Sequence, residues 1–252
     1  MKYLGITPEK IKVGVFDFTG CEGCELQLAN KEETLVDFLK AIEIVNFREI
    51  SSVKQHDYDL ALIDGAISRE DEVKRLEFIR KKAKILVAIG SCACFGGVNR
   101  LKNAFDLDEA NKEVYGDKPK ETEYVRSVKE VVKVDMEIPG CPVSKAEVER
   151  VVQHLIWDVQ FNFPVYPVCL ECKQRYTTCV FEKGLLCLGP ITRGGCEAPC
   201  PAGGLGCWGC RGPSADANYE EFYKIALERG FDKEEIKERM SFFGGFDKEI
   251  NS

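Results

Sequence analysis

Apolar residues fall in short runs separated by longer amphipathic stretches over the first 163 residues. The runs have the length of buried β-strands, and the stretches between them repeat their apolar positions at helical spacing. The expected strands are 12–18, 43–47, 59–65, 84–90 and 131–138, and the expected helices are 27–42, 70–82 and 144–159. Ser144 is the expected N-cap of the last helix, and Glu147 stands three residues later as in a capping box.

Strands that alternate with helices predict a parallel sheet with helices on both faces. We therefore expect an α/β fold, with a doubly wound domain over residues 1–163. From 164 to 216 the chain is rich in Cys, Gly and Pro and has neither helical nor strand periodicity, and 218–229 and 232–243 predict two short helices. A long irregular segment with many cysteines predicts a second domain, 164–252, held by bound metal more than by an apolar core.

Charge and composition narrow the class of protein. The 252 residues carry a net charge of −7, with basic and acidic residues intermixed, which argues against a nucleic-acid-binding surface. There is no secretion signal and no apolar run long enough to span a bilayer, so we expect a soluble cytoplasmic protein. The two histidines, His56 and His154, lie in unremarkable contexts, and no phosphate-binding loop or dinucleotide fingerprint is present.

Thirteen cysteines are many for a chain of this kind. Cytosolic thiols stay reduced, so these cysteines are expected to be metal ligands. Two alternatives remain at this point. Some hyperthermophiles keep disulfides in the cytosol, although the small gaps between many of these cysteines would strain such bonds. Structural zinc is the other, although zinc ribbons usually separate their ligand pairs by about 12–20 residues, and this array is denser.

Five cysteines follow expected strands of the first domain: Cys21, Cys24, Cys92, Cys94 and Cys141. The carboxyl ends of parallel strands share one edge of a sheet, and ligand sites form there. We therefore expect Cys21, Cys24 and Cys141 to meet one of the pair Cys92 and Cys94, and favour Cys92 because it follows the strand most directly. Four thiolates at one point bind zinc or a 4Fe–4S cluster.

The other eight cysteines lie in the second domain with the spacings C-x2-C-x6-C-x7-C and C-x3-C-x6-C-x2-C. They are Cys169, Cys172, Cys179, Cys187, Cys196, Cys200, Cys207 and Cys210. Eight is the number for two four-cysteine sites, divided either by block or with one cysteine exchanged, as in two-cluster ferredoxins. Twelve ligands and one remaining cysteine then fit three clusters.

Several motifs resemble those of a known family. The CEGCE turn at 21–25, GSCACFGG at 90–97 and PGCPV at 139–143 are similar to the small subunit of NiFe hydrogenases and to the homologous cluster subunit of respiratory complex I. The segment CLGPITRGGCEAPCPAGGLGCWGCRGP, 187–213, resembles the cytoplasmic branch of these hydrogenases, the NADP-linked or sulfhydrogenase type with its delta subunit. The likeness extends to about Pro213.

The resemblance implies a flavodoxin-like first domain and an irregular C-terminal iron–sulfur cluster domain. It implies a proximal 4Fe–4S cluster on Cys21, Cys24, Cys92 and Cys141, and medial and distal 4Fe–4S clusters on the eight C-terminal cysteines. Cys169 stands where periplasmic relatives have a histidine ligand, so ligation by cysteine alone is implied. Glu25, beside Cys24, would either carry protons at a subunit boundary or favour the first turn of its helix.

In function, the resemblance implies a non-catalytic electron-transfer subunit of a hydrogenase. The Ni–Fe centre would lie on a large subunit, and FAD and NADP on partners, namely a flavin-containing diaphorase subunit and a further iron–sulfur subunit. The acceptor stays open between NADP, a deazaflavin, heterodisulfide and polysulfide. Two alternatives are an iron–sulfur subunit of a nickel-free, complex I-like oxidoreductase and a zinc-stabilised interaction scaffold.

Overall fold

The structure, a computed structural model, describes residues 10–30 and 42–250. The chain divides into two compact units, 1–161 and 162–252. Unit 1 contains the parallel sheet, and unit 2 contains the cysteine-rich segment and the C-terminal helices. The expected assignment of one cluster to the first domain and two to the second stays a prediction.

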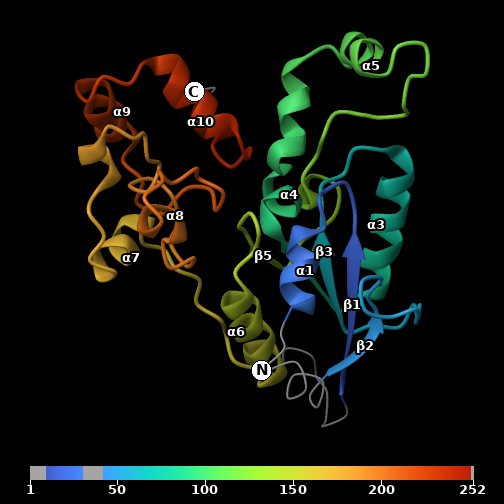
Figure 1. Ribbon diagram of the computed structural model, residues 1–252. Coiled ribbons are helices and arrows are strands. Elements are labelled where there is room, and N and C mark those ends of the chain that lie inside the picture. Colours follow the sequence, from blue (N-terminus) through green and yellow to red (C-terminus); the bar gives the residue numbers. More distant parts are fainter. Residues whose placement is uncertain (1–9, 31–41, 251–252) are drawn as a thin grey trace. The chain divides into compact units, whose positions relative to one another are not determined.

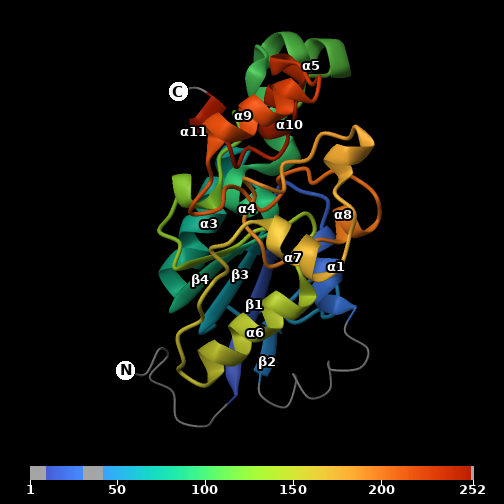
Figure 2. The same ribbon diagram turned by 90° about the vertical axis from the view of Figure 1, so that its left-hand side faces the viewer.

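Unit 1 is built on a five-stranded sheet (Figures 1 and 2). Its strands are β1 (Ile11–Asp17), β2 (Ile42–Asn46), β3 (Leu60–Asp64), β4 (Ile85–Ile89) and β5 (Met136–Ile138). All neighbours are parallel, and the order is β2-β1-β3-β4-β5. This is the doubly wound order of flavodoxin-like folds, and it confirms the predicted fold class.

Helices cover both faces of this sheet, as Figure 1 shows for α3 (Glu70–Lys82) and α6 (Lys145–Ile156). Ile63 of β3 packs in one apolar core with Leu76 and Ile79 of α3. Its neighbour Leu62 lines an apolar pocket together with Val152 of α6. Successive strand residues point to opposite faces, so a strand covered on both sides must be apolar throughout. β4 is apolar over its whole length, and β3 is apolar except for its last residue, Asp64.

Two sequence predictions in unit 1 need correction. The helix expected over 27–42 begins earlier, because Glu22 adopts a left-handed conformation and α1 (Gly23–Ala29) starts directly after it. Ile42 belongs instead to β2, where it pairs with Ile11, and residues 31–41 lie outside the described part. The strand expected over 131–138 is only β5, because the chain turns at 131–132, directly after the 3₁₀ helix η2 (Val128–Glu130), which begins with a capping box.

Between β4 and β5 the chain forms, besides η2, three helices that periodicity did not predict: α4 (Gly90–Phe95), η1 (Gly97–Ala104) and α5 (Leu107–Tyr115). Their sequences are short and rich in small or polar residues, which hides the helical pattern. The start of α6 is as predicted, since the Ser144 side chain accepts a hydrogen bond from the N–H of Glu147 at 3.4 Å.

Unit 2 begins with an irregular region that contains α7 (Val168–Gln174), η3 (Val180–Lys183) and α8 (Pro199–Ala202). The two predicted tail helices are confirmed as α9 (Tyr219–Glu228) and α10 (Lys233–Ser241), and α11 (Asp247–Ile250) follows. Leu188 of the cysteine-rich segment shares one apolar core with Phe222 of α9 and Ile236 of α10. The tail is therefore part of the packing that surrounds the cysteines.

Candidate metal centres

Three loops at the carboxyl edge of the sheet carry the cysteines of unit 1. Cys21 and Cys24 follow β1, Cys92 lies on α4 directly after β4, and Cys141 follows β5. Cys21 and Cys141 are exposed, whereas Cys24 is buried and Cys92 is partly buried. All four cysteines therefore lie at the carboxyl edge of the sheet, where the order of the expected strands predicts them.

Close approach of backbone to sulfur marks this site. Gly90 has φ +79, and a Cβ at this position would lie 2.4 Å from the Cys24 sulfur. Gly97 has φ +62, and a Cβ there would lie 2.6 Å from the Cys92 sulfur. Both glycines are needed for backbone conformation and for space, so they leave a cradle around two of the sulfurs that a side chain would fill.

The four thiols act on one another electrostatically. Burial raises the pKa of Cys92 to about 12, with further contributions from Asp64, Cys141 and Cys21. Burial also raises the pKa of Cys24, and the charges of Asp64 and Cys92 raise it further. The pKa of Cys141 is raised in the same way, by burial and then by Cys21 and Asp64. Crowded, buried thiols of this kind gain most when a cationic metal core replaces their protons. The donor set therefore fits a thiolate-bound metal group.

A zinc ion and a multi-iron cluster require different arrangements of their ligands. Within residues 10–30 and 42–250, no group of three or more His, Cys, Asp or Glu side chains gathers closely enough to hold one metal ion. Zinc needs four ligands at about 2.0–2.3 Å from one point, whereas a cluster binds each thiolate to a different iron. None of the thirteen cysteines, all of which lie within the described residues, forms a disulfide.

Cys94 lies apart from these four. It is fully buried in the apolar core between the sheet and α3, and its thiol donates to the carbonyl of Ala88 at 3.6 Å. Cys92 and Cys94 are two residues apart on α4, and therefore lie on different sides of the helix. The structure brings Cys92, and not Cys94, to the other three cysteines.

Asp64 and Glu25 are two buried acids beside the site that differ in their partners. Asp64, at the end of β3, accepts hydrogen bonds from the Cys24 thiol and from the N–H of Gly65, while burial raises its pKa. Glu25 is 1% exposed, and neither of its oxygens has a hydrogen-bond partner in the described part of the chain. Burial raises the pKa of Glu25 to about 8, with nearby Asp17 adding to it. Burial therefore favours the protonated form of the Glu25 carboxyl over the charged form.

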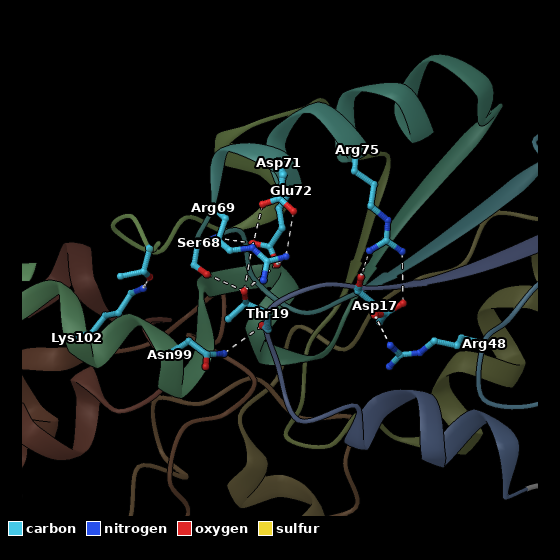
Figure 3. A network of polar contacts seen from close by, with 11 residues as sticks. Asp17, Thr19, Arg48, Ser68, Arg69, Asp71, Glu72, Arg75, Asn99 and Lys102 are labelled. Atoms are coloured by element: carbon cyan, nitrogen blue, oxygen red, sulfur yellow. Dashed lines mark hydrogen bonds and ion pairs between the residues drawn. The ribbon is translucent and has the colours of Figure 1, made fainter. Parts of the chain in front are cut away.

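A network of polar contacts supports the loop that carries Cys21 (Figure 3). The Thr19 hydroxyl donates to Glu72 at 2.9 Å and lies 2.7 Å from the Ser68 hydroxyl, and the N–H of Ser68 donates to Glu72 at 2.8 Å. The Asn99 amide donates to the carbonyl of Thr19 at 3.2 Å and to the Cys92 sulfur at 3.6 Å. The network thus links the loop after β1 to the sulfur after β4.

The buried Glu72 is the centre of this network, at 4% exposure. We expect Glu72→Gln to destabilise unit 1 by about 1–3 kcal/mol, because the Thr19 hydroxyl and the Ser68 amide lose a charged acceptor. Glu70→Gln, on the exposed side of the same helix, is the matched control and should change stability by less than about 0.5 kcal/mol. Urea unfolding of both variants measures the difference, and equal midpoints would contradict this role for Glu72.

In unit 2 the first four cysteines lie together. Cys169 and Cys172 are both on α7, and Cys179 and Cys187 follow on the next loops. Burial raises the pKa of Cys169 to about 12, and Cys187, Cys172 and Cys179 add to it in that order. Gly189 lies against two of these sulfurs, since a Cβ there would be 3.2 Å from Cys187 and 3.4 Å from Cys169.

The last four cysteines form two pairs, Cys196 with Cys200 and Cys207 with Cys210. Burial raises the pKa of Cys196, with Cys200 among the charges that add to it. Burial also raises the pKa of Cys207 well above its ordinary value, and Cys187 and Cys210 contribute. The N–H of Cys207 donates to the Cys187 sulfur at 3.2 Å. The two blocks of four therefore adjoin at Cys187 and Cys207.

Two buried charges lie between the blocks. Glu171, on α7, is 7% exposed and accepts hydrogen bonds from the N–H of Gly195 at 2.5 Å and from the Tyr166 hydroxyl at 3.3 Å. Arg211 is 1% exposed, donates from Nε to the carbonyl of Gly194 at 2.8 Å, and favours the Cys196 thiolate. Sequence analysis did not identify Asp64, Glu72, Asn99 or Glu171, because only the fold brings them to the cysteines.

Comparisons with known proteins find relatives that match most of the chain. The family "NADH ubiquinone oxidoreductase, 20 Kd subunit" matches residues 21–155. "Sulfhydrogenase 2 subunit delta" of Pyrococcus furiosus is 38% identical over 237 residues, covering 92% of this chain and 99% of that protein. A subunit of the F420-non-reducing hydrogenase vhu of Methanocaldococcus jannaschii is 32% identical over 235 residues, covering 80% and 82% respectively.

A solved hydrogenase structure is also similar to this chain. A chain of an NAD⁺-reducing [NiFe]-hydrogenase, in the H2-reduced state, superposes with a TM-score of 0.57 at 25% identity, covering 62% of this chain and 96% of that chain. None of the helices in residues 10–30 and 42–250 has the length and apolar character that a bilayer span requires.

Proposed function

The chain belongs to the family of the 20-kDa subunit of NADH:ubiquinone oxidoreductase, and we propose that it works as the electron-transferring small subunit of a cytoplasmic NiFe hydrogenase. The hydrogenase subunits among its relatives, at 38% and 32% identity over most of both chains, support this branch of the family. Complex I-like subunits usually lack a C-terminal array of eight cysteines, which disfavours the nickel-free alternative.

The observation that carries the proposal is the convergence of thiols from three strand ends, together with two further blocks that adjoin at Cys187 and Cys207. We assign Cys21, Cys24, Cys92 and Cys141 to the proximal site. We assign the block Cys169, Cys172, Cys179 and Cys187, and the block Cys196, Cys200, Cys207 and Cys210, to the medial and distal sites. The electrostatic grouping of the first of these two blocks supports division by block.

When bound, three 4Fe–4S clusters would supply one-electron carriers in series, and thiolate-ligated clusters reach about −400 mV, near the potential of hydrogen. The protein itself would fix where these carriers lie and exclude water from them. Buried Cys24, Cys172 and Cys207 reduce solvent access at each of the three sites. The amides of Asn99 and Cys207, by donating to the sulfurs of Cys92 and Cys187, stabilise the more negative reduced state.

The partners follow from this role. A large subunit would contribute the Ni–Fe centre and split hydrogen, and this chain would pass the electrons to a flavin-containing diaphorase subunit, with a further iron–sulfur subunit between them. The names of the similar proteins include an NAD⁺-reducing hydrogenase and a sulfhydrogenase. We therefore propose a nicotinamide cofactor, NAD or NADP, as the final acceptor, with sulfur or polysulfide as a second one.

Purification of the native complex under anaerobic conditions tests the function. We expect nickel in the complex, bleaching of the iron–sulfur absorbance under hydrogen, and reduction of NAD, NADP or polysulfide by hydrogen. A complex that contains iron and sulfide but no nickel, and that hydrogen does not reduce, would support the complex I-like alternative instead. A chain that contains zinc and no sulfide would support the interaction scaffold.

A further inference from the structure

The C-terminal helices have no role in the motifs that define the cluster sites. Yet α10 buries Ile236 completely and leaves Met240 1% exposed, in the same apolar core as Cys187 and Cys207. Phe246, just before α11, lies so close to Gly209 that a Cβ there would be 2.7 Å from the phenylalanine ring. The tail therefore packs directly against the loop that carries the last two cysteines.

One charged side chain of this tail reaches the cysteine loop. The guanidinium carbon of Arg239, on α10, lies 3.6 Å from the ring centroid of Trp208, the residue directly after Cys207. Trp208 also packs edge-on against Phe242, with 5.0 Å between the ring centroids. A guanidinium stacked on a held tryptophan ring gains a cation–π interaction, so its position is well defined.

The charge of Arg239 acts on two cysteines that belong to different blocks. Burial lowers the pKa of Arg239. The negative charges of Glu235, Cys187 and Cys207 act in the opposite direction and raise it. Cys187 and Cys207 are each 6% exposed, whereas Arg239 is partly exposed, so solvent screens part of the interaction between them. An arginine stays protonated in proteins, so a fixed positive charge lies beside the point where the two blocks adjoin.

We propose that Arg239 is a potential-setting residue: held on Trp208 by the C-terminal helices, it raises the reduction potential of the cluster that Cys207 ligates. The proposal rests on the proposed function, since it requires clusters on these cysteines. Reduction adds one negative charge to a cluster, and a nearby cation stabilises that charge. The C-terminal helices would then do more than stabilise the fold, because they supply an electrostatic element that no cysteine motif contains.

The test is an EPR-monitored redox titration of the anaerobically purified full chain in its complex. We expect Arg239→Gln to lower the ratio of reduced to oxidised cluster about tenfold at a fixed potential, which corresponds to about 59 mV for a one-electron couple. Arg239→Lys, which keeps the charge, should restore most of the ratio. Lys237→Gln, an exposed cation on the same helix, is the matched control and should change the ratio less than twofold.

A second variant, with an expected shift in the opposite direction, keeps the test decisive if the first variant misfolds. Glu235 lies one turn before Arg239 and its charge opposes that of the arginine, so Glu235→Gln should raise the ratio of reduced to oxidised cluster about twofold at the same potential. Unchanged potentials in both Arg239→Gln and Glu235→Gln would overturn the proposal. So would an equal loss in Arg239→Lys and Arg239→Gln, which would indicate a packing role alone. If Arg239→Gln loses its clusters, Glu235→Gln decides by itself. A wild-type chain without clusters would refute the proposed function instead.

Discussion

Cys92→Ala is expected to remove one 4Fe–4S cluster, about a third of the iron, whereas Cys94→Ala is expected to keep the full iron content. The two cysteines are two residues apart on the same short helix, but only Cys92 lies among the thiols of Cys21, Cys24 and Cys141. Alanine is preferred to serine because a serine oxygen can still bind iron. Hydrogen-dependent reduction of the remaining clusters in the complex should also fail in Cys92→Ala, because the proximal carrier is missing.

The two variants should separate in stability as well. Cys94→Ala removes a fully buried sulfur from the apolar core, and should cost about 1–2 kcal/mol in the free energy of unfolding. Iron analysis and thermal unfolding of both proteins measure the two effects. Full iron in Cys92→Ala together with depleted iron in Cys94→Ala would reverse the assignment of the ligand.

Removal of iron is expected to unfold much of the cysteine-rich segment while the sheet of unit 1 stays folded. Residues 164–216 contain only short helices, and their buried core includes three of the ligand cysteines, Cys172, Cys187 and Cys207, with Cys179 and Cys196 at its edge. Metal binding therefore contributes directly to folding there. The strands β3 and β4, in contrast, are buried throughout between two layers of helices.

Hydrogen–deuterium exchange of chelator-treated protein measures this difference. Peptides from 164–216 should lose about 100-fold or more of their protection, whereas peptides from β3 and β4 should change little. Peptides from α9 and α10 should lose an intermediate amount of protection, because these two helices also pack on each other through Tyr223 and Met240. Equal protection with and without iron throughout 164–216 would show that the clusters do not hold this unit.

The sequence was most informative where one physical rule controls many residues. Parallel strands bring their carboxyl ends to one edge, so the strand-like runs before Cys21, Cys92 and Cys141 were sufficient to expect convergence. Periodicity failed where an element is short or locally determined. Ile42 has the right spacing for the preceding helix, but it pairs with Ile11 in the sheet, a contact with a residue 31 positions away in the chain that no local pattern encodes.

The residues that surround the sulfurs were harder to predict for the same reason. Asn99 reaches the carbonyl of Thr19, 80 positions earlier in the chain, and Glu72 reaches the same residue from 53 positions away. Arg239 lies outside every cysteine motif, and only the packing of α10 brings it to Trp208. Ligands recur in recognisable spacings because metal chemistry restricts them, whereas many different residue types can supply a supporting hydrogen bond or charge.

The most direct test of the account is the metal and sulfide content of the anaerobically purified chain. Three 4Fe–4S clusters predict about twelve iron atoms and about twelve acid-labile sulfides per chain, with little zinc. A colourless protein with about three zinc ions and no sulfide would contradict the account.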